Sequence, residues 1–530
     1  SPDEKFLAYT EVDESSVGVK VRPRIHAEGT ELYEQRYPAA GEDNAKIRLH
    51  VREHLTGDCV EVDLPEEDGY LARVGWDRTH DLTVQWQSRD QKRLRLSRGV
   101  APDFDLKTLV EDRDDAWVEL HNDLRFLPDG RFLWPSEKSG VRQLYLHAAD
   151  GTEIAQLTRG PDPVTRLSGV GGNRVFYMRS TDRALRAHLF ATDLENPGTS
   201  AQVTKAPGYH SVSMSPDAKR MLDYHSSTFA PITVTVRTDT GDEVFQLDPN
   251  PAEEWRSLRK PKVSFVEVEA SDGTILNGRL VEPFDRQDGV KYPVIVYTYG
   301  GPTGPIVRDA FGGDAYTLYL AERGFAVFTL DNRGVGGRDR AFNRAFHNRF
   351  GDIEVEDQVA GARWLASVPW VDADRIGVWG WSYGGYLSAL LIMEPDTPFA
   401  AAVAVAPVTD WRLYDTHYTE RYIGKPQDNA EVYERSSVLP RATGLDRPFM
   451  LIHGMADDNV LFDNSLGLMS TLQTASIPFE LMVYPGKAHG LRGKGTRLHV
   501  YRTITNFFGR QLLGNHPLPR AGAPAQTGLD

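Results

Sequence analysis

The chain has 530 residues, more than one ordinary hydrophobic core can use, so we expect two domains. Its 75 acidic residues outnumber its 60 basic ones and give a formal net charge of -15, which argues against a nucleic-acid-binding surface. No run of about 18 uncharged apolar residues occurs, so no membrane span is expected, and the single cysteine, Cys59, excludes an internal disulfide and a thiolate metal cluster.

Residues 1–255 read as short strands separated by turns. Three turns share a phrase in which Pro2, Pro128 or Pro216 is followed by aspartate and then by a strand. The spacings between these prolines, 126 and 88 residues, are three times 42 and two times 44. An all-strand repeat of about 40 to 50 residues is typical of a β-propeller blade, so the region predicts a propeller of about six blades. A β-sandwich with chance Ser-Pro-Asp turns is the alternative.

The first of these turns lies at the start of the chain, so the predicted propeller begins in the middle of a blade. A propeller hides its strand edges by closing a ring, and we therefore expect amino-terminal blades to be missing from this chain. The chain also opens at Ser1 instead of methionine, as a processed or truncated protein would.

From residue 256 to residue 515 apolar strands alternate with helical patterns. A hairpin with Asp272-Gly273 at its turn comes first, and runs such as YPVIVYTYGG and RIGVWGWS follow, with helical patterns such as EVEDQVAGARWLASV between them. This alternation predicts a mostly parallel α/β sheet with helices on both faces. Residues 516–530 are rich in proline, alanine and glycine and are expected to form a disordered tail.

The stretch GWSYGGY places Ser382 between small residues and bulky aromatic ones. It fits G-x-S-x-G and stands between the strand RIGVWG and the helical run YLSALLIM. Small neighbours permit the sharp strand-to-helix turn that projects a serine hydroxyl from the sheet edge. We therefore predict an α/β-hydrolase domain with Ser382 as its nucleophile.

A serine nucleophile needs a base, and in this fold the acid and the histidine follow it in the chain. The strand PFMLIHG leads into MADDNV, where we prefer Asp457 to Asp458 as the acid. The strand FELMVYPG leads into KAHG, which puts His489 on the next loop of the same sheet edge. His453 ends a buried strand and is expected to pack or to support the site.

Several longer phrases carry a resemblance to a known family. They are GWSYGGY, YGGP at Tyr299, LDNRG at Leu330, DWRLYDTHYTERYIG at Asp410, HGMADDNV at His453, YPGKAHG at Tyr484 and, in the first half, YPAAG at Tyr37 and LPDGRFLWPSE at Leu127. Through them the chain resembles the prolyl oligopeptidase family of serine peptidases, and within it the dipeptidyl peptidase IV type from bacteria.

The resemblance implies roles for single residues. Ser382 would attack the scissile carbonyl, His489 would act as general base and then acid, and Asp457 would orient the imidazole. The hydroxyl of Tyr299 and the backbone N–H of Tyr383 would stabilise the oxyanion. A pocket for proline or alanine and the substrate's preceding carbonyl is implied by a further set: Val408, Trp411, Tyr414, Tyr418, Asn459 and Val460.

Two implied features are less complete in this sequence. Arg421 matches a charged residue of the active-site region, and an ordinary surface ion pair with Glu420 or a neighbour is the alternative. The paired glutamates that fix a substrate's free amino group in this family are not found, since Glu66-Glu67 and Glu253-Glu254 read as a turn and a linker. We expect that segment upstream of Ser1, and accordingly expect weak or no turnover from residues 1–530 alone.

The sequence thus predicts a serine exopeptidase that releases dipeptides with proline or alanine in second position. A tripeptidyl, acylaminoacyl or endo-acting prolyl peptidase of the same family is one alternative, and a non-catalytic propeller scaffold is another. No metal or organic cofactor is implied, and partners would be peptides with a free amino terminus. The family also implies a homodimer and, from bacterial relatives, a periplasmic or secreted location, with the cytoplasm as the alternative.

Overall fold

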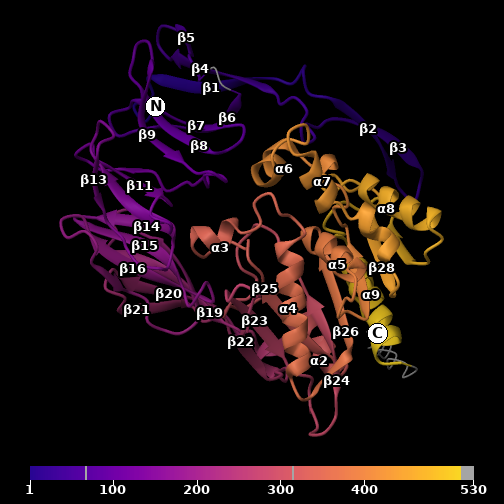
Figure 1. Cartoon of the computed structure of the whole chain (residues 1–530). Coiled ribbons are helices and arrows are strands. Elements are labelled where there is room, and N and C mark those ends of the chain that lie inside the picture. Colours follow the sequence, from indigo (N-terminus) through magenta and orange to yellow (C-terminus); the bar gives the residue numbers. More distant parts are fainter. Residues whose placement is uncertain (66–67, 313–314, 515–530) are drawn as a thin grey trace, which may run out of the picture.

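The structure, a computed structural model, describes residues 1–65, 68–312 and 315–514. Figure 1 shows an all-β region, which holds roughly the first 250 residues, arching around one side of an α/β region. The predicted fold class, an all-β propeller-like region followed by an α/β hydrolase domain, is confirmed. The domain boundary near residue 255 stays a prediction.

The strands of the all-β region are short and form sheets in which strands close in the chain are neighbours. Their bounds are β1 Phe6–Asp13, β2 Val19–Ile25, β3 Thr30–Arg36, β4 Lys46–Glu53, β5 Cys59–Val62, β6 Gly69–Trp76, β7 Leu82–Ser88, β8 Arg93–Gly99, β9 Leu106–Arg113, β10 Arg125–Phe126, β11 Phe132–Ser136, β12 Gln143–His147, β13 Glu153–Gln156, β14 Val164–Gly171, β15 Arg174–Thr181, β16 Arg186–Asp193, β17 Ser200–Gln202, β18 Tyr209–Met214, β19 Arg220–Ser227, β20 Ala230–Thr238 and β21 Glu243–Asp248.

These strands group into blade-sized sheets. One sheet has three strands in the order β1-β4-β5, two have four strands (β6 to β9 and β10 to β13), and one has eight, β14 to β21. Neighbouring strands are antiparallel except β16 and β18, which meet in parallel at Ala187 and Tyr209. β2 and β3 pair with each other in a separate two-stranded hairpin. The predicted number of about six blades stays a prediction.

The three Pro-Asp turns form as predicted. Each closes with a backbone hydrogen bond across four residues, from Glu4 N–H to the Ser1 carbonyl (3.0 Å), from Gly130 to Leu127 (3.1 Å) and from Ala218 to Ser215 (2.8 Å). Proline presets the backbone angle at the second position of such a turn, and the aspartate carboxylate accepts from backbone N–H groups that follow. The turns lead into β1, β11 and β19.

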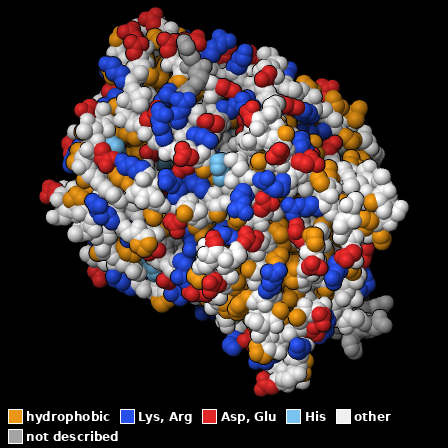
Figure 2. All heavy atoms as spheres, viewed as in Figure 1, with side chains coloured by type: hydrophobic (Ala, Val, Ile, Leu, Met, Phe, Trp, Pro, Cys, Tyr) orange, Lys and Arg blue, Asp and Glu red, His pale blue; other side chains and the backbone are white. Residues whose placement is uncertain are grey.

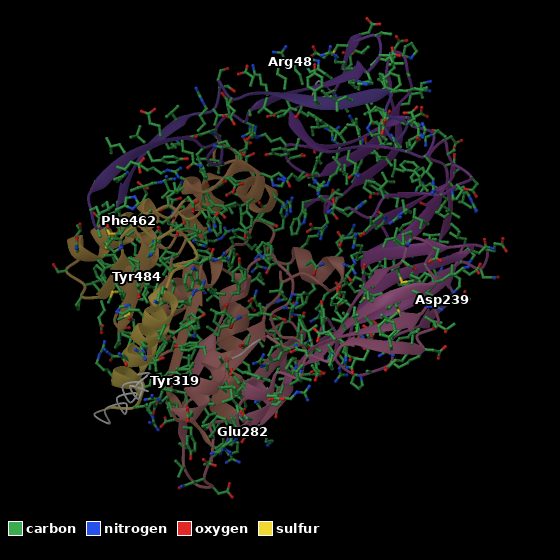
Figure 3. The ribbon with its side chains drawn as sticks, turned by 180° about the vertical axis from the view of Figure 1, so that it is seen from behind. Arg48, Asp239, Glu282, Tyr319, Phe462 and Tyr484 are labelled. Carbon is green, nitrogen blue, oxygen red and sulfur yellow. The ribbon has the colours of Figure 1, made fainter. Side chains whose placement is uncertain are left out.

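The β2–β3 hairpin crosses from the all-β region to the α/β region. The N–H of Gly486 donates to the Ile25 carbonyl (2.7 Å), and the N–H of Ile25 donates to the Met455 carbonyl (3.4 Å). Seen from behind in Figure 3, the hairpin reaches down toward the part of the α/β region that carries Phe462 and Tyr484. The hairpin thus contacts both loops on which the predicted acid and histidine lie.

The α/β region is built on one eight-stranded sheet in the order β22-β23-β25-β24-β26-β27-β28-β29. From β25 to β29 neighbouring strands are parallel, for instance with Val296 opposite Val378 in β24 and β26. The strand bounds are β22 Val263–Glu269, β23 Ile275–Val281, β24 Tyr292–Tyr297, β25 Ala326–Asp331, β26 Val371–Trp381, β27 Ala401–Val405, β28 Phe449–Gly454 and β29 Glu480–Tyr484.

Helices cover both faces of this sheet. The bounds are α1 Glu253–Ser257 (at the junction of the regions), α2 Ala315–Glu322, α3 Arg340–Arg344, α4 Ile353–Ser367, α5 Tyr383–Met393, α6 Thr416–Ile423, α7 Ala430–Ser436, α8 Asp463–Thr474 and α9 Thr496–Leu512, with 3-10 turns η1 Trp411–Leu413 and η2 Leu439–Gly444. One core joins strand residues such as Val294 to α4, α5 and α8, and a second joins Ile295 to α2 and α9. Successive strand residues face opposite sides, which explains the continuous apolar runs.

The surface carries both signs of charge. Figure 2 shows basic and acidic side chains interspersed over the face seen in Figure 1. Among the described residues no helix is long and apolar enough to cross a membrane.

Candidate active site

The predicted nucleophile lies on a strained turn between β26 and α5. Ser382 has φ 61° and ψ -118°, a conformation that residues with a side chain rarely adopt. Its N–H donates to the Val405 carbonyl (2.8 Å), which ties the turn to the neighbouring strand. The structure therefore places Ser382 at the sheet edge, as the G-x-S-x-G pattern predicts.

Glycines around Ser382 are required by contacts between backbone segments. A Cβ at Gly380 would lie 2.4 Å from the Gly384 carbonyl oxygen, and one at Gly384 would lie 2.2 Å from the Thr298 oxygen. Neither position can hold a larger residue without backbone movement. Tyr383 begins α5, so its N–H has no acceptor within the helix and lies at the positive end of the helix dipole.

Asp457, on the loop after β28, holds His489. The distance from His489 Nδ1 to Asp457 Oδ2 is 2.8 Å, while the other carboxylate oxygen accepts from the N–H groups of Asn459 and Val460, each at 3.0 Å. Burial pushes the pKa of Asp457 up, but hydrogen bonds from the two histidines that face it outweigh burial and lower the pKa below its usual value. Asp457 is therefore a carboxylate at neutral pH, and Nδ1 of His489 donates to it, which leaves Nε2 free to accept a proton.

His453 is the second histidine on Asp457. It is fully buried, and its Nε2 lies 3.1 Å from Asp457 Oδ2 and 2.9 Å from the Val460 carbonyl oxygen. Because both partners are acceptors, Nε2 carries a proton, and the Ser465 hydroxyl donates to Nδ1 (2.6 Å). His453 thus supports the acid from behind, in line with the supporting role expected from the sequence.

Ser382 and His489 line one pocket of about 360 Å³ together with a set of mostly aromatic residues. The remaining lining residues are Tyr297, Tyr299, Trp381, Tyr383, Val408, Trp411, Tyr414, Tyr418 and Asn459. Among the described residues that line this pocket none is a carboxylate. The pocket thus combines the predicted nucleophile, a histidine and apolar walls that can hold an apolar group by shape.

The aromatic walls contact one another. Trp411 and Tyr418 stack with ring centroids 5.9 Å apart at 16°, and Tyr414 meets Tyr418 edge-on at 5.2 Å. The hydroxyl of Tyr414 donates to Asn459 Oδ1 (3.0 Å), which links the wall to the loop of Asp457. Burial raises the pKa of Tyr414 to about 12, so this hydroxyl stays protonated. Such edge-to-face and stacked pairs hold the wall residues in defined positions.

Two expected residues lie elsewhere. Val460 is fully buried and is absent from the pocket lining, and its N–H holds Asp457 instead. Arg421 does not pair with Glu420: its Nε donates to Gln91 Oε1 of the all-β region (2.5 Å). Residues 66–67, one of the two glutamate pairs considered, lie outside the described residues.

Sequence reasoning missed Glu354, which is fully buried on α4 and accepts a hydrogen bond from the hydroxyl of Tyr383. Its other oxygen accepts from the N–H of Gly351 (3.1 Å). Burial raises the pKa of Glu354 to about 8. No local pattern marks it, because Glu354 lies almost thirty residues before Ser382 and one glutamate in a helix is ordinary.

Trp381 and Tyr297 were also missed as pocket residues. The indole N–H of Trp381 donates to the backbone carbonyl of His489 (3.0 Å), and the guanidinium of Arg497 lies over the Trp381 ring at 4.9 Å. The residue before Ser382 thus fixes the loop that carries His489. Trp381 is part of GWSYGGY, so its place in the motif could have indicated that it lines the pocket.

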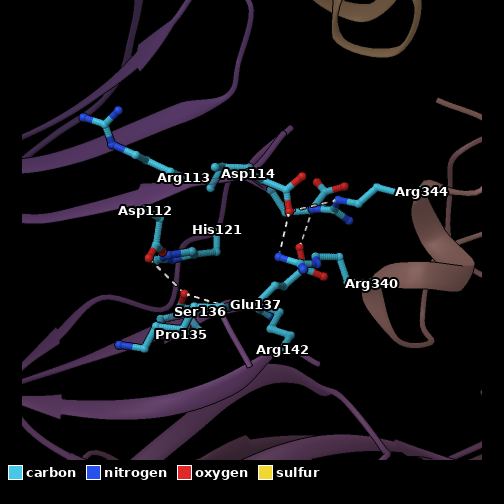
Figure 4. A pocket seen from close by; sticks show the side chains of 13 residues that line it. Asp112, Arg113, Asp114, His121, Pro135, Ser136, Glu137, Arg142, Arg340 and Arg344 are labelled. Atoms are coloured by element: carbon cyan, nitrogen blue, oxygen red, sulfur yellow. Dashed lines mark hydrogen bonds and ion pairs between the residues drawn. The ribbon is translucent and has the colours of Figure 1, made fainter. Parts of the chain in front are cut away.

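A second hollow lies between the all-β region and α3. Figure 4 shows Arg340 and Arg344 pointing toward Asp114 and Glu137 of the all-β region. Arg344 donates to Glu137 at 2.5 Å, and Arg340 lies 3.4 Å from Asp114. Burial lowers the pKa of His121, which also lines this hollow, well below its usual range. The hollow contains none of the predicted site residues and reads as an ionic contact between the two regions.

No group of three or more His, Cys, Asp or Glu side chains that could hold a metal ion occurs within residues 1–65, 68–312 and 315–514.

Two family descriptions match this chain. "Dipeptidyl peptidase IV (DPP IV) N-terminal region" matches residues 1–232, and "Prolyl oligopeptidase family" matches residues 312–515. The chain is 29% identical over 595 residues to mouse dipeptidyl peptidase 8, covering 96% of this chain and 66% of the relative. Human dipeptidyl peptidase 8 is likewise 29% identical, over 597 residues with the same shares covered. The chain thus spans about two thirds of the length of these curated relatives.

A solved structure agrees with these sequence matches. The crystal structure of Porphyromonas gingivalis dipeptidyl peptidase 4 superposes with a TM-score of 0.93 at 32% identity, covering 97% of this chain and 74% of that one. Both the all-β region and the α/β region fall within the matched length. The chain belongs to the prolyl oligopeptidase family of serine peptidases, in its dipeptidyl peptidase IV group.

Proposed function

We propose that the chain carries the catalytic site of a serine exopeptidase that releases dipeptides with proline or alanine in second position. The observation that carries the proposal is the 2.8 Å contact of His489 with Asp457 at a pocket that also holds Ser382 on its strained turn. The relatives are named dipeptidyl peptidases, which supports the reaction class.

In the proposed reaction Nε2 of His489 takes the proton of the Ser382 hydroxyl as the oxygen attacks the scissile carbonyl. The charge of Asp457 stabilises the imidazolium that forms. His489 then gives the proton to the departing amine, the carbon–nitrogen bond breaks, and an acyl-enzyme remains. Water attacks this ester in the second half of the cycle, with His489 again as base, and regenerates Ser382.

The oxyanion of each tetrahedral intermediate needs hydrogen-bond donors. We assign this role to the hydroxyl of Tyr299 and the backbone N–H of Tyr383. Burial raises the pKa of Tyr299, so its hydroxyl keeps its proton, and the Tyr383 N–H stands free at the start of α5. One well-placed donor is worth roughly 3 to 4 kcal/mol of transition-state stabilisation.

The aromatic pocket supports a preference for proline or alanine next to the scissile bond. A prolyl ring is short, flat and has no N–H, so it can be held by burial against Tyr414, Tyr418 and Trp411 without hydrogen bonds. A side chain with a charge would lose its hydration in this pocket, since none of the described lining residues is a carboxylate. Val408 closes the pocket as an apolar wall.

The way the substrate's amino end is held separates the alternatives. A dipeptidyl peptidase needs a negatively charged group near the substrate's free amino group. In an acylaminoacyl or endo-acting peptidase, that end of the binding cleft must instead be open or apolar. A blocked and an unblocked substrate of the same sequence therefore distinguish these proposals.

The first test is labelling with a fluorescent fluorophosphonate, because this reagent reports the nucleophile and its base without a bound amino terminus. We expect labelling of the wild-type chain and none of Ser382→Ala. Absence of labelling in the folded wild type, or equal labelling of the variant, overturns the proposal.

The second test measures release of p-nitroaniline from Gly-Pro, Ala-Ala-Pro and amino-blocked Gly-Pro anilides. Turnover of free Gly-Pro alone supports the dipeptidyl assignment. Preferred turnover of Ala-Ala-Pro or of the blocked substrate replaces that assignment with one of the other peptidase types.

A further inference from the structure

One side of the pocket is held by the all-β region. The segment from Trp411 to Ile423, which carries three aromatic walls, lies between the pocket and the sheet β6 to β9. Figure 1 shows α6 at the edge of the α/β region that faces this sheet.

Backbone hydrogen bonds make the first connection. The N–H of Ala40 donates to the Tyr414 carbonyl (2.9 Å), and the N–H of Thr416 donates to the Pro38 carbonyl (3.0 Å). Between them Ala39 and Asp415 form an antiparallel bridge. The wall residue Tyr414 is therefore joined by its own backbone to the other region.

A buried ion pair makes the second connection. Arg89 Nε lies 2.8 Å from Glu420 Oε2, and Arg89 Nη2 lies 2.8 Å from Glu420 Oε1. The side chains of Arg89 and Glu420 are 9% and 2% exposed, so both charged groups are shielded from solvent. Glu420 Oε1 also accepts from the N–H of Gly41 (2.8 Å), and Arg89 Nη2 donates to the Glu42 carbonyl (2.6 Å). Such a planar, two-pronged contact fixes orientation as well as distance.

Gln91 makes the third connection. Its amide oxygen accepts from Arg421 Nε (2.5 Å), and its amide nitrogen donates to the His417 carbonyl (2.5 Å). The ring of His417 meets Tyr70 edge-on at 4.8 Å. We call Gly41, Arg89 and Gln91, with their partners on α6, the α6 clamp.

The geometry of α6 couples clamp residues to a wall residue. At 100° per residue, His417, Glu420 and Arg421 fall within an arc of about 100° on the helix. Tyr418 lies about 60° beyond Arg421 on the same helix and lines the pocket. A movement of α6 allowed by loss of the clamp would therefore shift Tyr418 against Trp411. It would leave Ser382 and His489 in place, because β26 and the loop after β29 hold those two.

We propose that Arg89 and Gln91 are positioning residues that set the shape of the pocket from the other region, and so set the preference for proline over alanine. The inference rests on the proposed function of the pocket. Selection by shape requires fixed walls, since a pocket whose wall can move accepts a methyl group and a ring with similar ease.

The test compares Arg89→Met and Gln91→Leu with wild type in two readouts. Gly-Pro and Gly-Ala dipeptide phosphonates, which phosphonylate the nucleophile, measure selectivity as a ratio of inactivation rates without requiring turnover. A simple fluorophosphonate measures the reactivity of Ser382. We expect the Pro/Ala ratio to fall about tenfold in Arg89→Met and about threefold in Gln91→Leu. Fluorophosphonate labelling should stay within about twofold of wild type.

The matched control is Arg186→Met, which removes another contact between the regions, with Asp309 (3.3 Å), and touches no pocket residue. It should leave the Pro/Ala ratio unchanged. If Arg89→Met leaves the buried charge of Glu420 without a cation beside it and fails to fold, Arg89→Met/Glu420→Met replaces both charges by apolar groups and should fold with the same loss of selectivity.

The outcomes are distinct. A wild-type chain that reacts with the fluorophosphonate but shows no preference for Gly-Pro overturns the proposed specificity, and the inference with it. A selective wild type whose clamp variants are equally selective overturns the inference alone, as does an equal loss of selectivity in Arg186→Met. A loss confined to the clamp variants supports it.

Discussion

The proposed catalytic residues and the pocket walls are positioned by different parts of the molecule. Ser382, Asp457 and His489 stand on loops at one edge of a single parallel sheet, and the contacts that orient them come chiefly from the α/β region. The wall segment around Tyr414 and Tyr418 is held on its outer side by residues more than 300 positions earlier in the chain. Reactivity can thus be altered within one region, whereas selectivity depends on contact between two.

The largest expected effect is a loss of the reactivity of Ser382. Asp457→Asn would replace an acceptor that faces two imidazole N–H groups and would favour the wrong tautomer of His489. We expect the rate of fluorophosphonate labelling to fall by about 10³-fold to 10⁴-fold with the Pro/Ala ratio preserved. Asp458→Asn, an exposed neighbour, is the control and should label normally. Equal loss in both variants would contradict the assignment of the acid.

Tyr299→Phe also tests reactivity, and its expected effect is smaller than that of Asp457→Asn. The variant keeps the ring in the pocket and removes only the hydroxyl assigned to the oxyanion. We expect the rate constant for inactivation by the Gly-Pro phosphonate to fall by about 10²-fold with little change in the concentration that gives half the maximal rate, because the contact would form only in the transition state. A rise in that concentration with an unchanged rate constant would place Tyr299 among the binding residues instead.

Glu354→Gln tests the hydrogen bond from the hydroxyl of Tyr383 to Glu354. Tyr383 lines the pocket, and its backbone N–H is also the proposed oxyanion donor. The pKa of about 8 in the folded chain lies above the ordinary 4.5, so between these values the unfolded chain releases a proton that the folded chain keeps. Wild-type stability should therefore decline as pH rises through this window, by up to about 1.4 kcal/mol per pH unit, and level off above pH 8.

In Glu354→Gln this proton linkage is absent, so the stability of the variant relative to wild type should improve from pH 5.5 to pH 8. Urea unfolding at several pH values provides the measurement, with the exposed Glu322→Gln as control. A constant difference between variant and wild type across that range would show that Glu354 does not titrate there.

The smallest expected effect concerns the ionic hollow in Figure 4. Arg340 is partly exposed and lies 3.4 Å from Asp114, so Arg340→Met should cost at most about 1 kcal/mol and less at high salt. The melting temperature of wild type and variant, compared at low and high ionic strength, tests this. A loss as large as that of Arg89→Met would mean that both contacts between the regions contribute equally.

Much of the site was predictable because its residues follow rules that act over short distances in the chain. The glycines around Ser382 mark a turn that only they permit, and Asp457 and His489 each follow an apolar strand of the same sheet. The Pro-Asp turns likewise form where the sequence places them, at the starts of β1, β11 and β19. These signals depend on backbone geometry, which neighbouring residues dictate.

The residues that escaped prediction act across the fold. Glu354 looks like any helical glutamate until the packing of α4 against α5 buries it on Tyr383. Val460, implied as a wall residue, is fully buried and absent from the pocket lining, and its N–H donates to Asp457. Arg421 and Glu420 are neighbours in the chain and could have paired with each other. Instead Arg421 binds Gln91 and Glu420 binds Arg89, both in the all-β region.

By itself the sequence determined the strand and helix order, the strained turn at Ser382 and the chain order of the acid and the histidine, because steric limits on the backbone are local. Only the tertiary structure decided which charges are buried together and which region holds each wall of the pocket. Burial makes a lone charge costly and a matched pair such as Arg89–Glu420 specific, and burial exists only once distant segments have packed.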